Sequence, residues 1–323
     1  MSKNLDKKIT RKWCTNNMNE NLVSKIKELK KERNAIILAH FYQPPEIQAI
    51  ADEVGDSYYL SEVARDCKED VILFCGVKFM GESAKILSPE KTVLMPVENA
   101  GCVMAAMASE KAVVEMKEKY PEALTVCYIN STADVKAHCD VSVTSSSALK
   151  ILGNVENKQI LFLPDRNLGG YIAEHFPEKE FILWDGCCVI HDRIKESEIL
   201  ELKEAHPNAK VLVHPECQKL IRDMGDYVGS TSGIIKYATE NDAKEFIVAT
   251  EEGILYELQR KNPDKKFYFP GGKGVIQCKD MKKTTLESVY NTLLNMNNEV
   301  IVEEDVRVKA LNSLLNMHKL SEG

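Results

Sequence analysis

Three cysteines that recur at similar intervals are the residues of this chain best suited to chemistry. Cys102, Cys188 and Cys278 lie 86 and 90 residues apart, each in a loop that also contains glycine. Thiolates bind soft metals, mainly zinc, copper(I) and iron–sulfur clusters. Because no fourth cysteine recurs with this spacing, a cubane held by the three would keep one iron free to act as a Lewis acid. The alternative is that all three are buried structural cysteines in equivalent turns of a duplicated fold.

Polar side chains recur with the same period as the cysteines. Three short apolar runs each carry a polar residue near their end, and a hydroxyl residue follows 17 positions later. The residues near the ends of the runs are His40, Tyr128 and His214. The hydroxyl residues are Ser57, Ser145 and Thr231. Each hydroxyl opens a helical pattern and fits a helix cap, and helix N-termini present N–H groups that suit a carboxylate or a phosphate.

The elements that must position these residues also repeat three times. Each unit contains three apolar runs that predict buried parallel strands, alternating with helical patterns. The expected strands lie at residues 35–42, 71–74, 92–95, 124–130, 160–163, 181–184, 211–216, 246–249 and 266–269. The alternation predicts an α/β protein with three homologous three-layer αβα units, each built on a short parallel sheet. Ligands bind beyond the carboxyl ends of such strands, so we expect a pseudo-threefold arrangement around one central active site.

The expected units span residues 30–104, 105–190 and 191–280, and residues 281–323 are expected to form a helical tail that packs back on the core. Hydrophobic residues make up 44% and charged residues 28% of the 323 residues, which is typical of a soluble globular protein. The net charge of −7 argues against nucleic-acid binding. The polar N-terminus and the lack of a long apolar run predict no secretory signal, no membrane span and a cytoplasmic location.

Eight short segments together resemble the quinolinate synthase family over about residues 36–282. They are AHFYQ at 39–43, VGDS at 54–57, FMGESAK at 79–85, NAGC at 99–102, WDGCC at 184–188, HPE at 214–216, GSTS at 229–232 and CKDMK at 278–282. The family pattern W-x-G-x-C makes Cys188 the ligand and Cys187 the variable residue. Phe41 departs from the polar residue found at this position in many relatives.

The resemblance implies the condensation of iminoaspartate with dihydroxyacetone phosphate to quinolinate, phosphate and water in de novo NAD biosynthesis. It implies one [4Fe–4S] cluster per chain with three Cys ligands and an iron open to substrate, and a possible transient contact with the enzyme that supplies iminoaspartate. The implied substrate-binding residues are His40, Ser57, Tyr128, Asn130, Ser145, His214, Glu216 and Thr231. The implied catalytic residues are Glu216, His40, Tyr42 and His191.

Glu216 is expected to project into the shared cavity, beside bound carboxylates and a negatively charged cluster, which would raise its pKa. Two other functions fit the same residues. One is another [4Fe–4S] hydro-lyase acting on a small polycarboxylate, and the other is a metal-free module that only binds a dicarboxylate among three capped helices.

Overall fold

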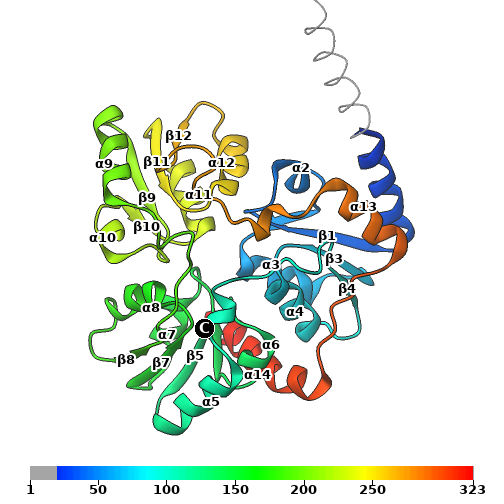
Figure 1. The fold of residues 1–323 in the computed structure, drawn as a ribbon, viewed down its shortest axis with the longest axis horizontal. Helices are drawn as coiled ribbons and strands as arrows, with labels where there is room; N and C mark the ends of the chain where they lie inside the picture. The colour runs from blue at the N-terminus through cyan, green and yellow to red at the C-terminus, as the bar shows by residue number, and fades with distance from the viewer. Residues whose placement is uncertain (1–19, 323) are drawn as a thin grey trace, which may run out of the picture.

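The computed structural model describes residues 20–322, and it shows three similar α/β units around a common centre (Figure 1). Each unit contains a four-stranded, wholly parallel sheet. The strand orders are β2-β1-β3-β4, β6-β5-β7-β8 and β10-β9-β11-β12. The predicted α/β class with three αβα units is therefore confirmed. The N-terminal segment in which no secretory signal is expected lies outside the described residues, apart from residue 20.

The first unit follows a helix at residues 20–32. Its elements are β1 (Ala35–His40), α2 (Pro45–Gln48), β2 (Glu53–Gly55), α3 (Ser57–Asp66), β3 (Val71–Cys75), α4 (Lys78–Leu87) and β4 (Thr92–Leu94). The second unit contains η1 (Ala105–Met107), α5 (Glu110–Lys119), β5 (Leu124–Tyr128), α6 (Ala133–Lys136), β6 (Val141–Val143), α7 (Ala148–Gly153), β7 (Gln159–Leu163), α8 (Arg166–Ala173) and β8 (Glu180–Leu183).

The third unit contains α9 (Glu196–Ala205), β9 (Lys210–Val213), α10 (Lys219–Arg222), β10 (Tyr227–Val228), α11 (Thr231–Glu240), β11 (Glu245–Ala249), η2 (Glu252–Ile254), α12 (Leu255–Lys261) and β12 (Lys266–Tyr268). The chain ends with η3 (Asp280–Lys282), α13 (Leu286–Asn295) and α14 (Glu304–Glu322). Within residues 20–322, no helix is long and apolar enough to span a membrane. Each sheet falls inside one of the expected segments, and the boundaries between the units stay predictions.

Each sheet has one strand more than the sequence predicts. The additional strands, β2, β6 and β10, are two or three residues long and pair with the first strand of their unit. These strands, EVG, VSV and YV, lie in no apolar run as long as those that predict the other strands, so the sequence gives no signal for them. These strands lead directly into the loops that carry the predicted hydroxyl residues.

Apolar packing joins the units and fixes their relative positions. One core cluster contains buried residues of the first two units together with Ala310, Leu314 and Met317 of α14. This last helix, red in Figure 1, packs against α4, α6, α7 and β6. Phe41, just beyond β1, packs in a core cluster of the third unit, which explains an apolar residue at this position.

Candidate active site

A cavity of about 320 Å³ lies where the carboxyl ends of the three sheets face one another. All thirteen residues predicted for the site line it. They are His40, Tyr42, Ser57, Cys102, Tyr128, Asn130, Ser145, Cys188, His191, His214, Glu216, Thr231 and Cys278. The structure therefore brings the whole predicted set together from all three units. The chemical role of each residue stays a prediction.

Strand register gives the residues around the cavity equivalent places in the three units. The first strand of each unit pairs with the next inner strand through equivalent residues, namely Ala39 with Cys75, Cys127 with Leu163, and Val213 with Ala249. The residues that directly follow those of the first strands, His40, Tyr128 and His214, are therefore equivalent. The residues two positions after the strand-end histidines and tyrosine are therefore equivalent as well. They are Tyr42, Asn130 and Glu216. Each unit thus contributes a donor at the end of its first strand and a different functional group two residues later.

The loops of the three cysteines share one backbone hydrogen bond that sets their register. A residue at the start of a helix donates its N–H to the carbonyl two positions before the cysteine, at 2.8–2.9 Å. The donor and acceptor pairs are Lys78 and Ala100, Arg166 and Gly186, and Glu252 and Ile276. Cys102, Cys188 and Cys278 are therefore equivalent, and we call them the cavity cysteines. Cys187 is buried beside Met107 and does not line the cavity.

His40 and His214 are held in the same way and present the same group. The backbone N–H of Tyr42 donates to Nδ1 of His40 at 3.1 Å, and that of Glu216 donates to Nδ1 of His214 at 3.3 Å. Burial lowers the pKa of both histidines to about 3, with the nearby charge of Lys282 adding to the effect at His40. A neutral ring whose Nδ1 accepts must carry its proton on Nε2. Both rings are thus neutral N–H donors.

The hydroxyls Ser57, Ser145 and Thr231, which we call the cavity hydroxyls, do not themselves cap helices, although the predicted loop of the third unit caps α11 with another hydroxyl, that of Ser230. Ser57 and Thr231 are the first residues of α3 and α11, and the caps are the side chains of the preceding Asp56 and Ser230. In the second unit, α7 begins only at Ala148. Because other side chains cap α3 and α11, the cavity hydroxyls are free to face a ligand beside the helix N-termini.

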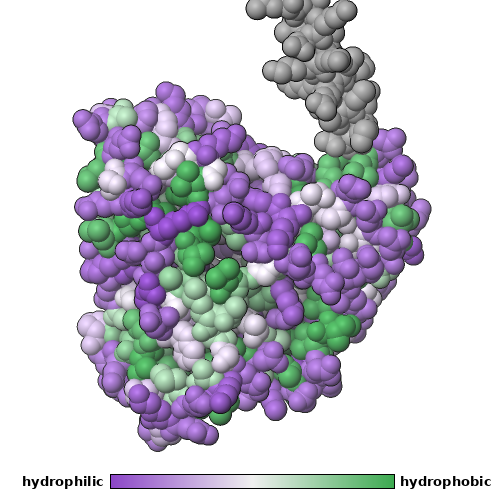
Figure 2. All heavy atoms as spheres, viewed as in Figure 1, coloured by the Kyte–Doolittle hydropathy of each residue, from purple (hydrophilic) through white to green (hydrophobic). Residues whose placement is uncertain are grey.

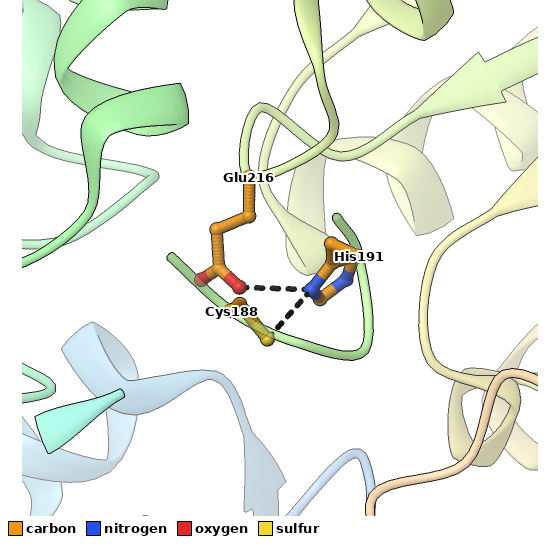
Figure 3. Close-up of side chains that lie close together, drawn as sticks. All are labelled: Cys188, His191 and Glu216. Carbon is orange, nitrogen blue, oxygen red and sulfur yellow. Dashed lines mark hydrogen bonds and ion pairs between the residues drawn. The ribbon is translucent and has the colours of Figure 1, made fainter. Parts of the chain in front are cut away.

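Glu216 and His191 form the centre of a buried hydrogen-bonded group (Figure 3). Nδ1 of His191 lies 2.8 Å from Oε2 of Glu216 and 3.2 Å from the sulfur of Cys188. Tyr128 donates its hydroxyl to Oε1 of Glu216 at 2.6 Å. The carboxylate and the histidine side chains are only 5% and 2% exposed. Both carboxylate oxygens are therefore used by neighbouring side chains.

The expected rise in the pKa of Glu216 is wrong for this arrangement. Burial by itself raises the pKa, but the neighbouring His191 and His214 and the hydrogen bonds from His191 and Tyr128 outweigh it and lower the pKa. By contrast, burial and the charge of Glu216 raise the pKa values of Tyr42 and Tyr128 well above the usual value. The site thus combines an ionised carboxylate with two protonated phenols.

Two further features of the cavity indicate a polar, anionic ligand. Oδ1 of Asn130 is buried without a hydrogen-bond partner in the structure, so it is an acceptor open to a ligand hydroxyl or N–H. Arg193 and Lys279 also line the cavity, and neither forms an ion pair within residues 20–322.

Figure 2 shows apolar residues among polar ones near the centre of one face. The exposed Val103 and Val189 contribute apolar surface to the lining of the cavity.

The cavity cysteines fit an iron–sulfur cluster better than a single metal ion. Among residues 20–322, one set of three potential ligands lies within 4.8 Å, namely Cys188, His191 and Glu216. At least two of the cavity sulfurs are therefore more than 4.8 Å apart. Tetrahedral zinc with Zn–S bonds of about 2.3 Å would place sulfurs about 3.8 Å apart. A four-iron cluster is larger and can connect thiolates at wider separation.

Burial keeps the thiols of the cavity cysteines protonated as long as no metal is bound. Burial raises the pKa of Cys102 to about 12 and raises the pKa values of Cys188 and Cys278. These thiols need a bound cation to lose their protons at neutral pH, which is the usual condition of metal-ligating cysteines.

Carboxylates that the sequence analysis missed hold the cysteine loops in place. Asp165 accepts the backbone N–H of Cys188, and Glu251 accepts that of Cys278, both at 3.0 Å. Asp280 accepts the N–H of Gly101 at 3.2 Å. Asp165 and Glu251 occupy equivalent positions, two residues after β7 and β11. An acidic residue at this shared spacing is the signal that could have identified them.

Comparison with known proteins gives a consistent result. The protein family described as quinolinate synthetase A protein matches residues 24–319. The chain is 72% identical over 306 residues to a quinolinate synthase of Clostridioides difficile strain 630, covering 95% of this chain and 100% of the relative. It is 57% identical over 296 residues to one of Clostridium perfringens strain SM101, covering 92% and 98%. It is 54% identical over 304 residues to one of Caldicellulosiruptor saccharolyticus, covering 94% and 99%.

Proposed function

Because the chain belongs to the quinolinate synthetase A protein family, we propose that it condenses iminoaspartate with dihydroxyacetone phosphate. The products would be quinolinate, phosphate and water, in the de novo pathway to NAD. The observation that carries the proposal is the convergence of three equivalent cysteines and a set of neutral donors on one cavity of about 320 Å³. A cavity of this size suits small polar molecules.

The three cavity cysteines would hold one [4Fe–4S] cluster. Such a cluster has one iron without a cysteine ligand and supplies a Lewis acid for a substrate oxygen. Asp165 and Glu251 would keep the loops of Cys188 and Cys278 in position by accepting their backbone N–H groups.

The remaining lining suits anionic substrates. The neutral N–H groups of His40 and His214 and the cavity hydroxyls are donors for carboxylate oxygens. The N-termini of α3 and α11 add favourable dipoles, since each helix has ten residues and starts beside the cavity. Arg193 and Lys279, which form no ion pair within residues 20–322, are suited to the phosphate group of the triose.

Proton transfers fall to the buried carboxylate and phenols. Glu216 is ionised, so it can accept a proton without first losing one. Tyr42 and Tyr128 keep their protons because burial raises their pKa values, and either phenol can donate a hydrogen bond to a substrate oxygen. Isomerisation and dehydration both require such paired donors and acceptors.

The test is an assay of protein purified without oxygen. We expect about four irons and four sulfides per chain and quinolinate formation that requires both substrates. Cys278→Ser should lose the iron and the activity, whereas the adjacent-cysteine control Cys187→Ser should keep both. Iron without quinolinate formation, together with dehydration of a small polycarboxylate, would favour a different hydro-lyase. Protein that binds a dicarboxylate but contains no iron would favour the metal-free binding module.

A cytoplasmic location and a transient contact with the enzyme that supplies iminoaspartate complete the proposal. Iminoaspartate is unstable, and a direct transfer would shorten its exposure to water. Cross-linking of the two enzymes during turnover would detect the contact.

A further inference from the structure

We propose that Thr250 positions Tyr42 and His191 for the reaction, although it does not line the cavity. This inference rests on the proposed function. Thr250 directly follows β11, and its side chain is completely buried. It is absent from the residues around the cavity. Any effect of its hydroxyl on a substrate must therefore pass through neighbouring side chains.

The hydroxyl of Thr250 connects two predicted catalytic residues from different parts of the chain. Its Oγ1 lies 3.0 Å from the hydroxyl of Tyr42 and 2.9 Å from Nε2 of His191. The hydroxyl of Tyr42 also lies 2.9 Å from Oγ1 of Thr231. Tyr42 belongs to the first unit, and His191 follows the loop of Cys188. Within the described residues, Thr250 is thus the one residue that is hydrogen-bonded to both side chains.

These contacts extend from Thr250 to Glu216. The carboxylate of Glu216 accepts from Tyr128 through one oxygen, and its other oxygen lies 2.8 Å from Nδ1 of His191. The second ring nitrogen of His191, Nε2, contacts the hydroxyl of Thr250. The hydroxyl of Thr250 also contacts that of Tyr42, which in turn contacts Oγ1 of Thr231. The orientations of Tyr42 and His191 therefore both depend on Thr250.

The fold itself does not require a hydroxyl at this position. Strand register makes Ala249 equivalent to Cys75 and Leu163. Each of the three pairs with the residue of the first strand that directly precedes His40, Tyr128 or His214. The residues equivalent to Thr250 are therefore Gly76 and Pro164, and neither has a side-chain hydroxyl. Two units form the same sheet without this group. The hydroxyl is present only in the unit that also contributes Glu216 and Thr231.

Loss of the hydroxyl should disturb the site without unfolding the protein. Thr250→Val keeps the branched shape but removes the hydroxyl that contacts both Nε2 of His191 and the hydroxyl of Tyr42. Both side chains then have alternative orientations, and small misplacements of catalytic groups lower turnover strongly. Thr250→Ser restores the hydroxyl and should restore most of the function. Thr125→Val is the matched control, since Thr125 is also fully buried and its hydroxyl has no hydrogen-bond partner among the residues that the structure describes.

The experiment measures kcat and KM for quinolinate formation without oxygen, with the visible spectrum and the melting temperature of each variant. We expect Thr250→Val to lower kcat by about tenfold to a hundredfold with little change in KM. Thr250→Ser and Thr125→Val should stay close to the wild type. In a Tyr42→Phe background, Thr250→Val should cause a smaller loss than it does alone, because the two residues act as one unit.

Full turnover in Thr250→Val would overturn the inference, and so would equal losses in the two backgrounds or no rescue by serine. A wild-type protein that forms no quinolinate would overturn the proposed function instead. Crystal structures of Thr250→Val would then decide the inference alone. Displaced Tyr42 or His191 side chains would support it, and unchanged side chains would overturn it.

Discussion

Glu216→Gln separates chemistry from binding at this site. The glutamine side chain has nearly the shape of the glutamate but cannot take up a proton at neutral pH. Glu216 accepts from Tyr128 at 2.6 Å and lies 2.8 Å from Nδ1 of His191. The amide can keep its carbonyl towards His191 and turn its NH₂ group towards the oxygen of Tyr128. We therefore expect the cavity to keep its shape.

The size of the effect follows from these two contacts. Each hydrogen bond to a charged group contributes about 1.5–3 kcal/mol, against about 1 kcal/mol for a neutral one. Removing the charge of Glu216 thus weakens its two hydrogen bonds by about 1–4 kcal/mol in total. The loss is offset in part, because a buried charge no longer has to be kept out of water. Loss of a positioned acid or base lowers turnover by about 10²–10⁴-fold. Substrate binding should change much less than turnover.

Kinetics without oxygen, with the visible spectrum as a control for the cluster, provide the measurement. Glu257→Gln is the matched control, because Glu257 is equally buried, is bonded to Arg260 at 2.7 and 2.9 Å, and does not line the cavity. It should keep full turnover. Near-normal turnover of Glu216→Gln would refute the reasoning and leave His40 and Tyr42 as the better candidates for acid–base chemistry.

Three other sets of substitutions test the rest of the site. Replacing any cavity cysteine with serine should abolish the bound iron, measured after purification without oxygen. Cys187→Ser should keep the iron. If Cys187→Ser lost the iron and Cys188→Ser kept it, the register of that loop would be off by one. Alanine at each cavity hydroxyl should weaken substrate binding by about 1–3 kcal/mol in titrations. Thr231→Ala should also lower turnover, because the hydroxyl of Thr231 contacts Tyr42. A structure with a dicarboxylate bound far from all three cavity hydroxyls would contradict their role in substrate binding. In Asp165→Asn, the visible absorption of the cluster should fade about tenfold to a hundredfold faster in air, because a residue that orients a metal ligand is lost. An unchanged rate of fading would show that the carboxylate of Asp165 does not hold the loop of Cys188.

The sequence alone determined the three units and most of the residues predicted for the site. Parallel strands place their carboxyl ends at one edge of a sheet, so His40, Tyr128 and His214 had to lie on equivalent edges. The equal spacing of the hydroxyls and cysteines follows from the same duplication. Tyr42, Asn130 and His191 lie outside that pattern as it was first recognised, and the resemblance to a family supplied them.

Only the tertiary structure decided how residues of different units contact one another. The sign of the pKa shift of Glu216 depends on His191, which belongs to another loop and lies beside it only in the folded protein. Thr250 shows the same dependence, since its partner Tyr42 is more than 200 positions away in the chain. Local spacing fixes the edge of a sheet at which a side chain lies. Contacts between units depend on long-range packing, which no short sequence pattern contains.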